Sequence, residues 1–278
     1  MIEGKGLTMR FGNNTALDGV DVCFGDNKIY GQLGRNGAGK STLLSVVTNR
    51  LLPTAGEVFI DGEPARENDR VLGRVYYMGE KTLLPDTATV AQLFRWTGDF
   101  YPGFDGEYAG QLADTFGLPE KKKLKNLSTG YLTIAKLIAA LASNAPYTLF
   151  DEPVLGLDAN HREVFYRQLI ESYSRQPRTI LISTHLIEEV ADIIEQVVII
   201  KAGKILLDRP AEEVKRMGYT VSGRAEAVDA YCTGRDVLSV DTLGGLKTAC
   251  ILGKAEEAPG LDVSGLDMQK LFIRLTNV

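Results

Sequence analysis

Residues 34–42 read GRNGAGKST, which fits the phosphate-binding pattern G-x-x-x-x-G-K-[ST]. Glycines in such a loop let the backbone wrap around phosphate groups, the lysine neutralises their charge, and the hydroxyl that follows can bind Mg²⁺. The stretch follows an apolar segment and opens a helical pattern, as this motif requires, so a glycine-rich turn without a ligand is the less favoured alternative. The candidate nucleotide-binding residues are Gly34, Asn36, Gly37, Ala38, Gly39, Lys40, Ser41 and Thr42.

Two adjacent acids follow an apolar segment in TLFDEP (148–153). A carboxylate at the end of a buried strand is costly unless it serves a cation. Asp151 suits a Mg²⁺ ligand, and Glu152 suits a general base that deprotonates an attacking water. Two such acids alone are more often solvated, but together with a phosphate loop the functional interpretation is favoured.

A second phosphate site is suggested by LSTGY (127–131), which opens the apolar helical pattern LTIAKLIAALA. Free backbone N–H groups at a helix start favour an anion. Ser128 and Gly130 are the candidate contacts. A serine-capped core helix is the alternative interpretation of this stretch.

The elements that must position these residues alternate between short apolar segments and helical patterns. Strands are predicted at YTLF (147–150), TILIS (179–183) and VVII (197–200), and their apolar character on both faces indicates a mostly parallel sheet covered on both sides. Antiparallel additions are predicted at 56–62 and 197–207, and helices at 40–52 and 186–196.

Two other regions differ from this pattern. Residues from about 81 to 145 are rich in helical patterns and aromatics and predict a helical insertion. The segment RPAEEVKRMG (209–218) predicts a helix that Gly218 ends. The predicted domains are therefore 1–218 and a small α+β unit, 219–278, with a strand, a helix at AEAVDAYC, a hairpin around Gly244-Gly245 and a last helix near MQKLFIRL.

The composition narrows the classes of function. The chain has 278 residues, a net charge of −5 and a pI near 5.3, so it lacks a global basic field that would recruit nucleic acid. No apolar run approaches the ~18 residues of a membrane span, and the first residues do not look like a signal peptide. The three cysteines have no zinc-type spacing, which favours reduced thiols in a cytoplasmic protein.

The order GRNGAGKST, LSTGY, TLFDEP, GLDA and STH resembles the nucleotide-binding subunit of an ABC transporter, over residues 1 to about 215. This resemblance implies an α/β fold: a P-loop NTPase (RecA-like) core with an antiparallel β subdomain and a helical insertion. It also implies a homodimer or pseudo-dimer, in which LSTGY is the signature motif that binds the γ-phosphate of ATP held by a second subunit.

The resemblance also implies roles for single residues. Phe11 would stack on adenine, Asp158 in GLDA would belong to a loop that couples the two active sites, and His185 would contact the γ-phosphate. Glu80 stands where a glutamine usually touches Mg²⁺ and the attacking water. The expected catalytic residues are then Lys40, Glu80, Glu152 and His185, and the expected metal ligands are Ser41, Glu80 and Asp151.

Three features depart from the family pattern: Glu80, the signature, in which Thr129 and Tyr131 replace the usual glycine and glutamine, and the helix after the signature, which lacks the usual basic residues. His161 matches no family position and is expected to be a solvated helix residue.

The implied protein is an Mg·ATP-dependent ATPase on the inner face of the cell membrane. It would power a separate integral membrane permease subunit, in an exporter of the drug or antimicrobial-peptide type, and would not bind nucleic acid. The alternatives are a soluble ABC-type ATPase acting on ribosomes or DNA and a weakly hydrolysing ATP-binding regulatory subunit.

Overall fold

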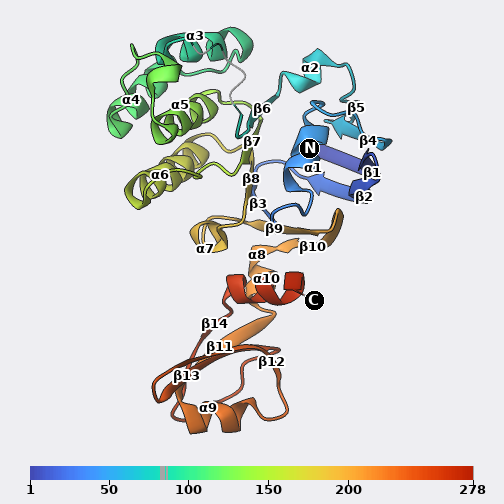
Figure 1. The fold of residues 1–278 in the computed structure, drawn as a ribbon, viewed down its shortest axis with the longest axis vertical. Coiled ribbons are helices and arrows are strands. Elements are labelled where there is room, and N and C mark those ends of the chain that lie inside the picture. Colours follow the sequence, from blue (N-terminus) through green and yellow to red (C-terminus); the bar gives the residue numbers. More distant parts are fainter. Residues whose placement is uncertain (82–84, 86, 278) are drawn as a thin grey trace.

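A six-stranded sheet forms the centre of the computed structural model, which describes residues 1–81, 85 and 87–277 (Figure 1). Its order is β10-β9-β3-β8-β7-β6, with β3 (Ile29–Leu33), β6 (Val75–Met78), β7 (Tyr147–Asp151), β8 (Thr179–Thr184), β9 (Gln196–Lys201) and β10 (Lys204–Pro210). All neighbours are parallel except β10, which returns antiparallel along β9. The predicted parallel strands are confirmed. Because β3, β7 and β8 run the same way, the residues that follow them meet at one edge of the sheet.

A second, antiparallel sheet packs beside the first. Its order is β2-β1-β4-β5, with β1 (Ile2–Phe11), β2 (Asn14–Phe24), β4 (Ala55–Ile60) and β5 (Glu63–Pro64). The strand predicted at 56–62 is thus real, but it belongs to this separate sheet. Helix α1 (Lys40–Val47) contacts β1, β2 and β7, so the phosphate-loop helix lies between the two sheets.

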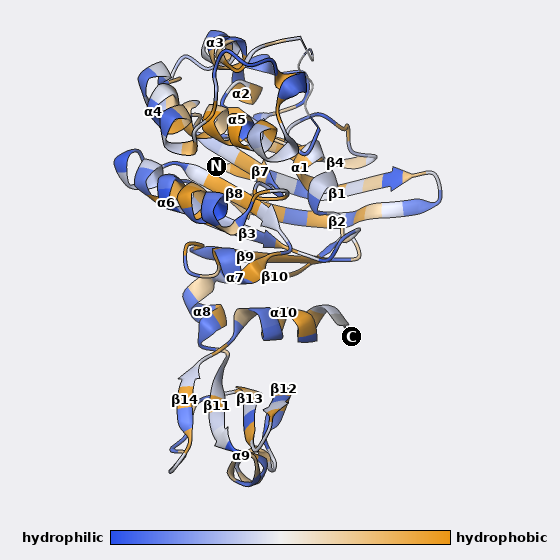
Figure 2. Ribbon diagram, turned by 60° about the vertical axis from the view of Figure 1, so that its left-hand side comes forward, coloured by the Kyte–Doolittle hydropathy of each residue, from blue (hydrophilic) through white to orange (hydrophobic). Residues whose placement is uncertain are grey.

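The region predicted as a helical insertion contains α3 (Val90–Phe100), α4 (Gly106–Phe116), the 3-10 turn η1 (Leu124–Asn126) and α5 (Thr129–Ala142). Helix α5 is apolar on nearly every side, and Figure 2 shows it and the central strands as the most hydrophobic part of the molecule. Helix α6 (Ala159–Arg175) packs below it, and short α2 (Asp69–Leu72) precedes β6. The fully buried Phe150 of β7 and Phe165 of α6 meet edge to face, 5.6 Å between ring centroids.

A third sheet occupies the far end of the molecule (Figure 1). It has the antiparallel order β12-β13-β11-β14, with β11 (Gly218–Arg224), β12 (Asp236–Leu243), β13 (Leu246–Leu252) and β14 (Asp262–Gly265). Helix α9 (Ala225–Cys232) and the hairpin at Gly244-Gly245 lie as predicted.

The last helix, α10 (Met268–Asn277), packs against both the small sheet and the larger unit. Its buried Leu271 and Phe272 join the same hydrophobic core as Ile187 and Val190 of α7 (Ile187–Val190). The C-terminal unit is therefore packed against the larger one rather than suspended from a linker.

Three predicted helices are shorter than expected. Helix α7 replaces the predicted helix over 186–196, because Glu195 is already tied to Ile29 of β3 by its backbone and its carboxylate. Helix α1 ends at Val47, and Asn49 turns the chain with a φ of +54°.

The predicted helix over 209–218 is α8 (Ala211–Lys215), and Gly218 does not end it. Gly218 opens β11 instead. A methyl group there would lie 2.3 Å from the carbonyl oxygen of Ile251, so glycine permits close strand pairing.

Candidate active site

The loop between β3 and α1 has the shape that its glycines predict. Gly39 adopts a φ of +112°, and a methyl group there would lie 2.7 Å from the carbonyl oxygen of Ala16. At Gly34 a methyl group would lie 2.8 Å from the carbonyl oxygen of Ile200. Lys40 starts α1 with its side chain 6% exposed, and its Nζ donates to the Gly34 carbonyl at 2.7 Å. The loop is thus tightly folded around a buried cation.

Glu152 and His185 form a hydrogen-bonded pair at the end of the neighbouring strands. Glu152 Oε2 lies 2.9 Å from His185 Nδ1 and accepts from the Thr184 hydroxyl at 3.3 Å. Its other oxygen, Oε1, lies 3.5 Å from Lys40 Nζ. A carboxylate only accepts hydrogen bonds, so Nδ1 carries the proton and Nε2 of His185 is left available.

The backbone of Glu152 holds a conformation that non-glycine residues rarely adopt. Its φ is +50°, and its N–H donates to the Ser183 carbonyl at 2.8 Å. Such strain is typical of residues whose position is fixed by function. Here it turns the side chain off the end of β7 toward Lys40 and His185.

Asp151 has one carboxylate oxygen that the protein does not satisfy. Its Oδ2 accepts from the Tyr77 hydroxyl at 3.1 Å, while Oδ1 is buried with no hydrogen-bond partner among the described residues. Burial raises the pKa of this carboxyl, and the nearby hydroxyl groups of Ser41, Tyr77 and Ser183 act in the opposite direction. A buried oxygen without a partner, close to the Ser41 hydroxyl, fits a cation ligand.

The residues present therefore fit Mg²⁺ bound together with a nucleotide. Across the described ranges, no cluster of three or more His, Cys, Asp or Glu side chains could hold a metal by itself. Mg²⁺ keeps several waters and commonly takes one or two carboxylates plus substrate phosphates, so a site of this kind needs no such cluster.

Most of the predicted site residues line one open cleft of about 610 Å³. Its lining includes Phe11, Glu80, Glu152 and His185 and the loop residues Asn36, Gly37, Gly39, Lys40, Ser41 and Thr42. Phe11 is 47% exposed, which is high for so large an apolar side chain and leaves its ring free to stack on a planar group. Asn14, Ala16, Arg35 and Leu155 also line the cleft and were not predicted.

The loop at Glu80 is held by a lysine that the sequence did not single out. Lys136 of α5 donates from Nζ to the carbonyl oxygens of Gly79 and Glu80, at 2.8 Å each. Burial lowers the pKa of Lys136, and the Glu80 charge raises it. This cation offsets part of the charge that a glutamate adds where the family has glutamine. The contact joins residues that are 56 positions apart, so the sequence did not reveal that Lys136 holds this loop. A single lysine in an otherwise apolar helix was the one feature that pointed to it.

Replacing Lys136 by methionine should lower ATP hydrolysis about 10-fold, because the Glu80 loop would lose both bonds that fix it beside the cleft. ATP binding at Lys40 should change little. The measurement is steady-state hydrolysis with nucleotide affinity determined separately. Lys125→Met removes an exposed charge from the same helical region and should have no effect. Equal losses in the two variants would contradict the positioning role.

Ser128, Gly130 and Asp158 are not among the described residues that line the cleft. Ser128 caps α5, with its Oγ accepting from the Tyr131 N–H at 3.3 Å, and Asp158 caps α6. A single chain therefore does not bring these three predicted contacts to its own Lys40.

His161 lies on a helix as predicted, but its side chain is only partly exposed. Its Nδ1 lies 2.8 Å from Asp158 Oδ2, and its ring packs on Phe116 and Tyr131. His161 is the third residue of α6, and the sequence did not predict these contacts because they come from α4 and α5.

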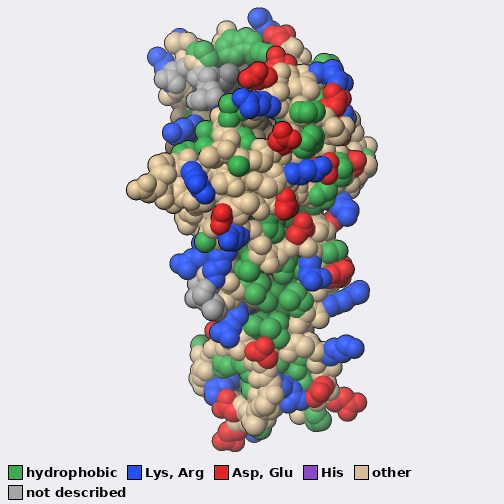
Figure 3. Space-filling model, turned by 90° about the vertical axis from the view of Figure 1, so that its right-hand side faces the viewer, with side chains coloured by type: hydrophobic (Ala, Val, Ile, Leu, Met, Phe, Trp, Pro, Cys, Tyr) green, Lys and Arg blue, Asp and Glu red, His purple; other side chains and the backbone are tan. Residues whose placement is uncertain are grey.

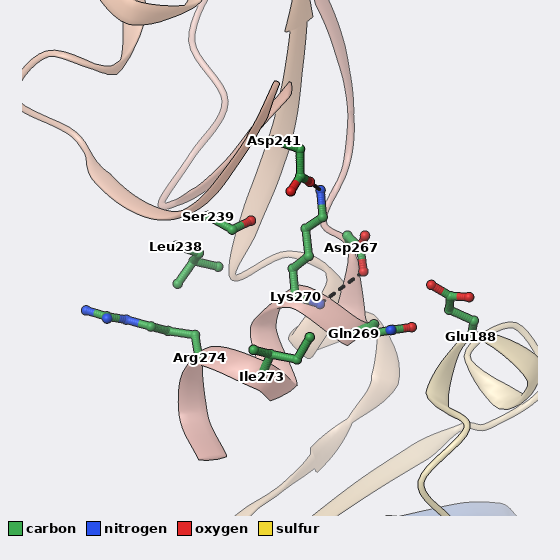
Figure 4. Close-up of a pocket in the computed structure, with 9 residues that line it drawn as sticks. All are labelled: Glu188, Leu238, Ser239, Asp241, Asp267, Gln269, Lys270, Ile273 and Arg274. Atoms are coloured by element: carbon green, nitrogen blue, oxygen red, sulfur yellow. Dashed lines mark hydrogen bonds and ion pairs between the residues drawn. The ribbon is translucent and has the colours of Figure 1, made fainter. Parts of the chain in front are cut away.

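A second hollow, of about 480 Å³, lies between α7, α10 and β12 (Figure 4). Leu238 and Ile273 give it apolar surface, and Lys270 crosses it to pair with Asp241. Figure 3 shows hydrophobic side chains gathered where the molecule narrows between the two units, with Lys and Arg on either side. This hollow shares no lining residue with the cleft that holds Lys40.

A phosphate loop that encloses a buried lysine, strand-end acids and a histidine on a parallel sheet define an ATPase of the P-loop class. Comparison with known proteins then identifies the family. The family model described as "ABC transporter" matches residues 17–155. The chain belongs to the ATP-binding proteins of ABC transporters.

Two curated relatives come from Bacillus subtilis (strain 168). The ABC transporter ATP-binding protein YtrB is 30% identical over 190 residues, which are 68% of this chain and 65% of that protein. The ABC transporter ATP-binding protein NatA is 30% identical over 201 residues, which are 69% of this chain and 80% of that protein. The match to YtrB spans just under two thirds of its length.

Solved structures of ATP-binding cassettes share the fold. One titled "Structure of ATP binding subunit of ABC transporter" has a TM-score of 0.70 and 22% identity, covering 78% of this chain and 92% of that chain. Another, the dimeric post-hydrolysis state of the cassette MJ0796 bound to ADP and Pi, has a TM-score of 0.67 and 23% identity, covering 76% and 99%. These comparisons confirm the predicted α/β P-loop fold.

Proposed function

We propose that the chain hydrolyses ATP as a dimer in which each nucleotide lies between two subunits and that it powers a separate membrane permease. The observation that carries the proposal is the separation of the site into two parts. The cleft with Lys40, Glu152 and His185 is open, and Ser128 and Gly130 lie outside it on the same chain. A second copy would supply the missing side of the cleft.

Each cleft residue has a role in this scheme. Lys40 would neutralise the β- and γ-phosphates, and phosphate would then compete with Glu152 for that cation. Glu152 Oε1 would be released to accept a proton from the attacking water, while His185 Nδ1 keeps Oε2 in place. Phe11 would stack on adenine. Charge neutralisation and positioning supply most of the rate in such reactions.

Mg²⁺ would neutralise phosphate oxygens when it is bound with ATP. Ser41 and Asp151 are the residues that fit it, with Glu80 at the cleft wall as the third proposed ligand. Their part is to hold the cation in place; the proton is taken up at Glu152.

The transport role requires a partner. None of the helices in the described ranges combines the length and the apolar character needed to cross a bilayer. The proposed location is therefore peripheral, on the inner face of the cell membrane beside an integral membrane subunit. Phe100 at the end of α3 is 77% exposed, and it is the kind of apolar side chain that a partner would cover.

An exporter is the proposed type of transporter. A relative from Streptomyces coeruleorubidus, named daunorubicin resistance ATP-binding protein DrrA3, is 28% identical over 220 residues, which are 77% of this chain and 69% of that protein. The tail that ends in LFIRLT resembles the C-terminal extension of bacterial exporter ATPases, which supports the same assignment.

Purification of the chain from native membranes in mild detergent should yield a multi-span protein in stoichiometric amount. Phe100→Asp should reduce its recovery, because a charge would replace exposed apolar surface at the proposed contact. Leu243→Asp is the matched control, since Leu243 is 84% exposed at the opposite end of the molecule. Recovery of ribosomes or DNA in place of a membrane protein would favour the soluble alternative.

A further inference from the structure

The signature segment (residues 127–131) and the coupling segment (residues 156–158) of one chain are packed directly on each other. A methyl group at Gly130 would lie 3.2 Å from the carbonyl oxygen of Gly156. A methyl group at Gly156 would lie 3.5 Å from the Cγ2 of Thr129. Gly130 permits this close approach, and Thr129, a departure from the family pattern, lies at the contact.

His161 of α6 joins the same two segments through its side chain. Asp158 accepts from the backbone N–H of His161 at 2.9 Å with one oxygen, and its other oxygen lies 2.8 Å from His161 Nδ1. Both hydrogen bonds lower the pKa of the Asp158 carboxyl. With both oxygens engaged, this carboxylate is held against its own helix.

The imidazole ring also touches the signature segment. It meets Tyr131 edge on, with 6.3 Å between ring centroids, and stacks on the buried Phe116 of α4 at 6.2 Å and 17°. Tyr131 is the second departure in the signature, where glutamine is usual. An aromatic ring at this position therefore has a partner in this chain, and that partner is His161.

We propose that His161 is a positioning residue that holds the signature segment and the coupling segment in one fixed arrangement. This inference rests on the proposed function, in which both segments act on the ATP bound by the partner subunit. Loss of the imidazole would remove the hydrogen bond to Asp158 Oδ2 and the ring contact with Tyr131 together. The defect would then appear at the partner's ATP, while the chain's own Lys40 cleft stays intact.

Mixed dimers of the full-length chain test this directly, because Lys40→Met can leave one working ATP in each dimer. Two differently tagged chains are co-expressed, one with Lys40→Met, and only mixed dimers are isolated. The working ATP then lies on the chain with Lys40 and faces the signature of the chain with Lys40→Met. His161→Ala is placed either on the chain with Lys40→Met or on the other.

We expect His161→Ala to lower hydrolysis about 10-fold when it shares a chain with Lys40→Met, and less than about 2-fold in the other arrangement. A defect in folding alone would reduce both arrangements equally, and that result would overturn the proposal. Ser128→Ala, tested in the same two arrangements, separates the hypotheses. If the effect of Ser128→Ala does not depend on the arrangement, the proposed ATP site shared between two subunits is wrong. If the effect of Ser128→Ala depends on the arrangement and that of His161→Ala does not, only the positioning role of His161 is wrong.

Two further variants distinguish the contribution of the ring contacts of His161 from that of its hydrogen bond to Asp158. His161→Asn can place an N–H near Nδ1 and so keep the bond to Asp158, whereas His161→Phe keeps a ring beside Phe116 and Tyr131. Each variant, placed on the chain with Lys40→Met, should hydrolyse ATP faster than His161→Ala in the same arrangement. Hydrolysis by both variants at the level of His161→Ala would contradict the role of these contacts.

Discussion

Replacement of Glu152 by glutamine should reduce ATP hydrolysis by about 10²–10⁴-fold and leave ATP binding nearly unchanged. Glutamine has almost the same shape as glutamate but cannot accept a proton from the attacking water. The 3.5 Å ion pair with Lys40 would be lost as well, which leaves that cation entirely to the phosphates. Binding therefore has no reason to weaken.

The same substitution should trap the dimer. If hydrolysis releases two subunits from each other, a variant that binds ATP without cleaving it should elute as a stable dimer in Mg·ATP. Light scattering coupled to size-exclusion chromatography, with and without nucleotide, measures this. Glu163→Gln, an exposed glutamate on α6, is the control and should behave like the parent. A parent-like rate in Glu152→Gln would show that another group takes the proton.

The strands and the phosphate loop could be predicted because their signals are local. Runs of four or five residues, YTLF, TILIS and VVII, predicted β7, β8 and β9, and the spacing in GRNGAGKST placed Lys40 at the start of a helix, where α1 begins. Strand ends that carry acids or a histidine then had to meet at one edge of a parallel sheet. Asp151 and Glu152 were predicted from their position at the end of a strand, whereas His185 was predicted from the family resemblance.

The features that the sequence did not reveal depend on contacts between distant segments. Lys136 holds the Glu80 loop from 56 residues away, and Tyr77 bonds Asp151 from 74 residues away. The pattern at 186–196 is helical, but pairing of Glu195 with β3 ends α7 after Val190. His161 was treated as solvated because its partners Phe116 and Tyr131 belong to other helices. Periodicity reports which face is apolar, not which element will cover it.

The departures from the family pattern have compensations in the structure. Glu80 adds a charge beside the cleft, and Lys136 supplies a cation bound to that loop. Thr129 and Tyr131 alter the signature, and Gly156 and His161 lie against them. These contacts support our proposal of an active ATPase over the weakly hydrolysing regulatory subunit.

Replacing Lys40 by methionine should weaken ATP binding about 100-fold, which corresponds to about 2.7 kcal/mol. Methionine fills the space of the lysine stem but removes the cation that faces the phosphates. Thermal unfolding with and without Mg·ATP measures the loss. At an ATP concentration near 100 times the parent's Kd, the nucleotide should stabilise the parent by about 2.7 kcal/mol and the variant by about 0.4 kcal/mol.

The thermal stability of Lys40→Met without nucleotide distinguishes weaker ATP binding from a folding defect. Lys40 is only 6% exposed, so its charge is expensive to bury, and Glu152 keeps its bonds from His185 and Thr184 after the cation is gone. The melting temperature without ATP should therefore change little. Lys254→Met removes an exposed lysine from the C-terminal unit and should retain the full stabilisation by ATP. Parent-like stabilisation of Lys40→Met by ATP would place the phosphates elsewhere, and the cleft could not then be the nucleotide site.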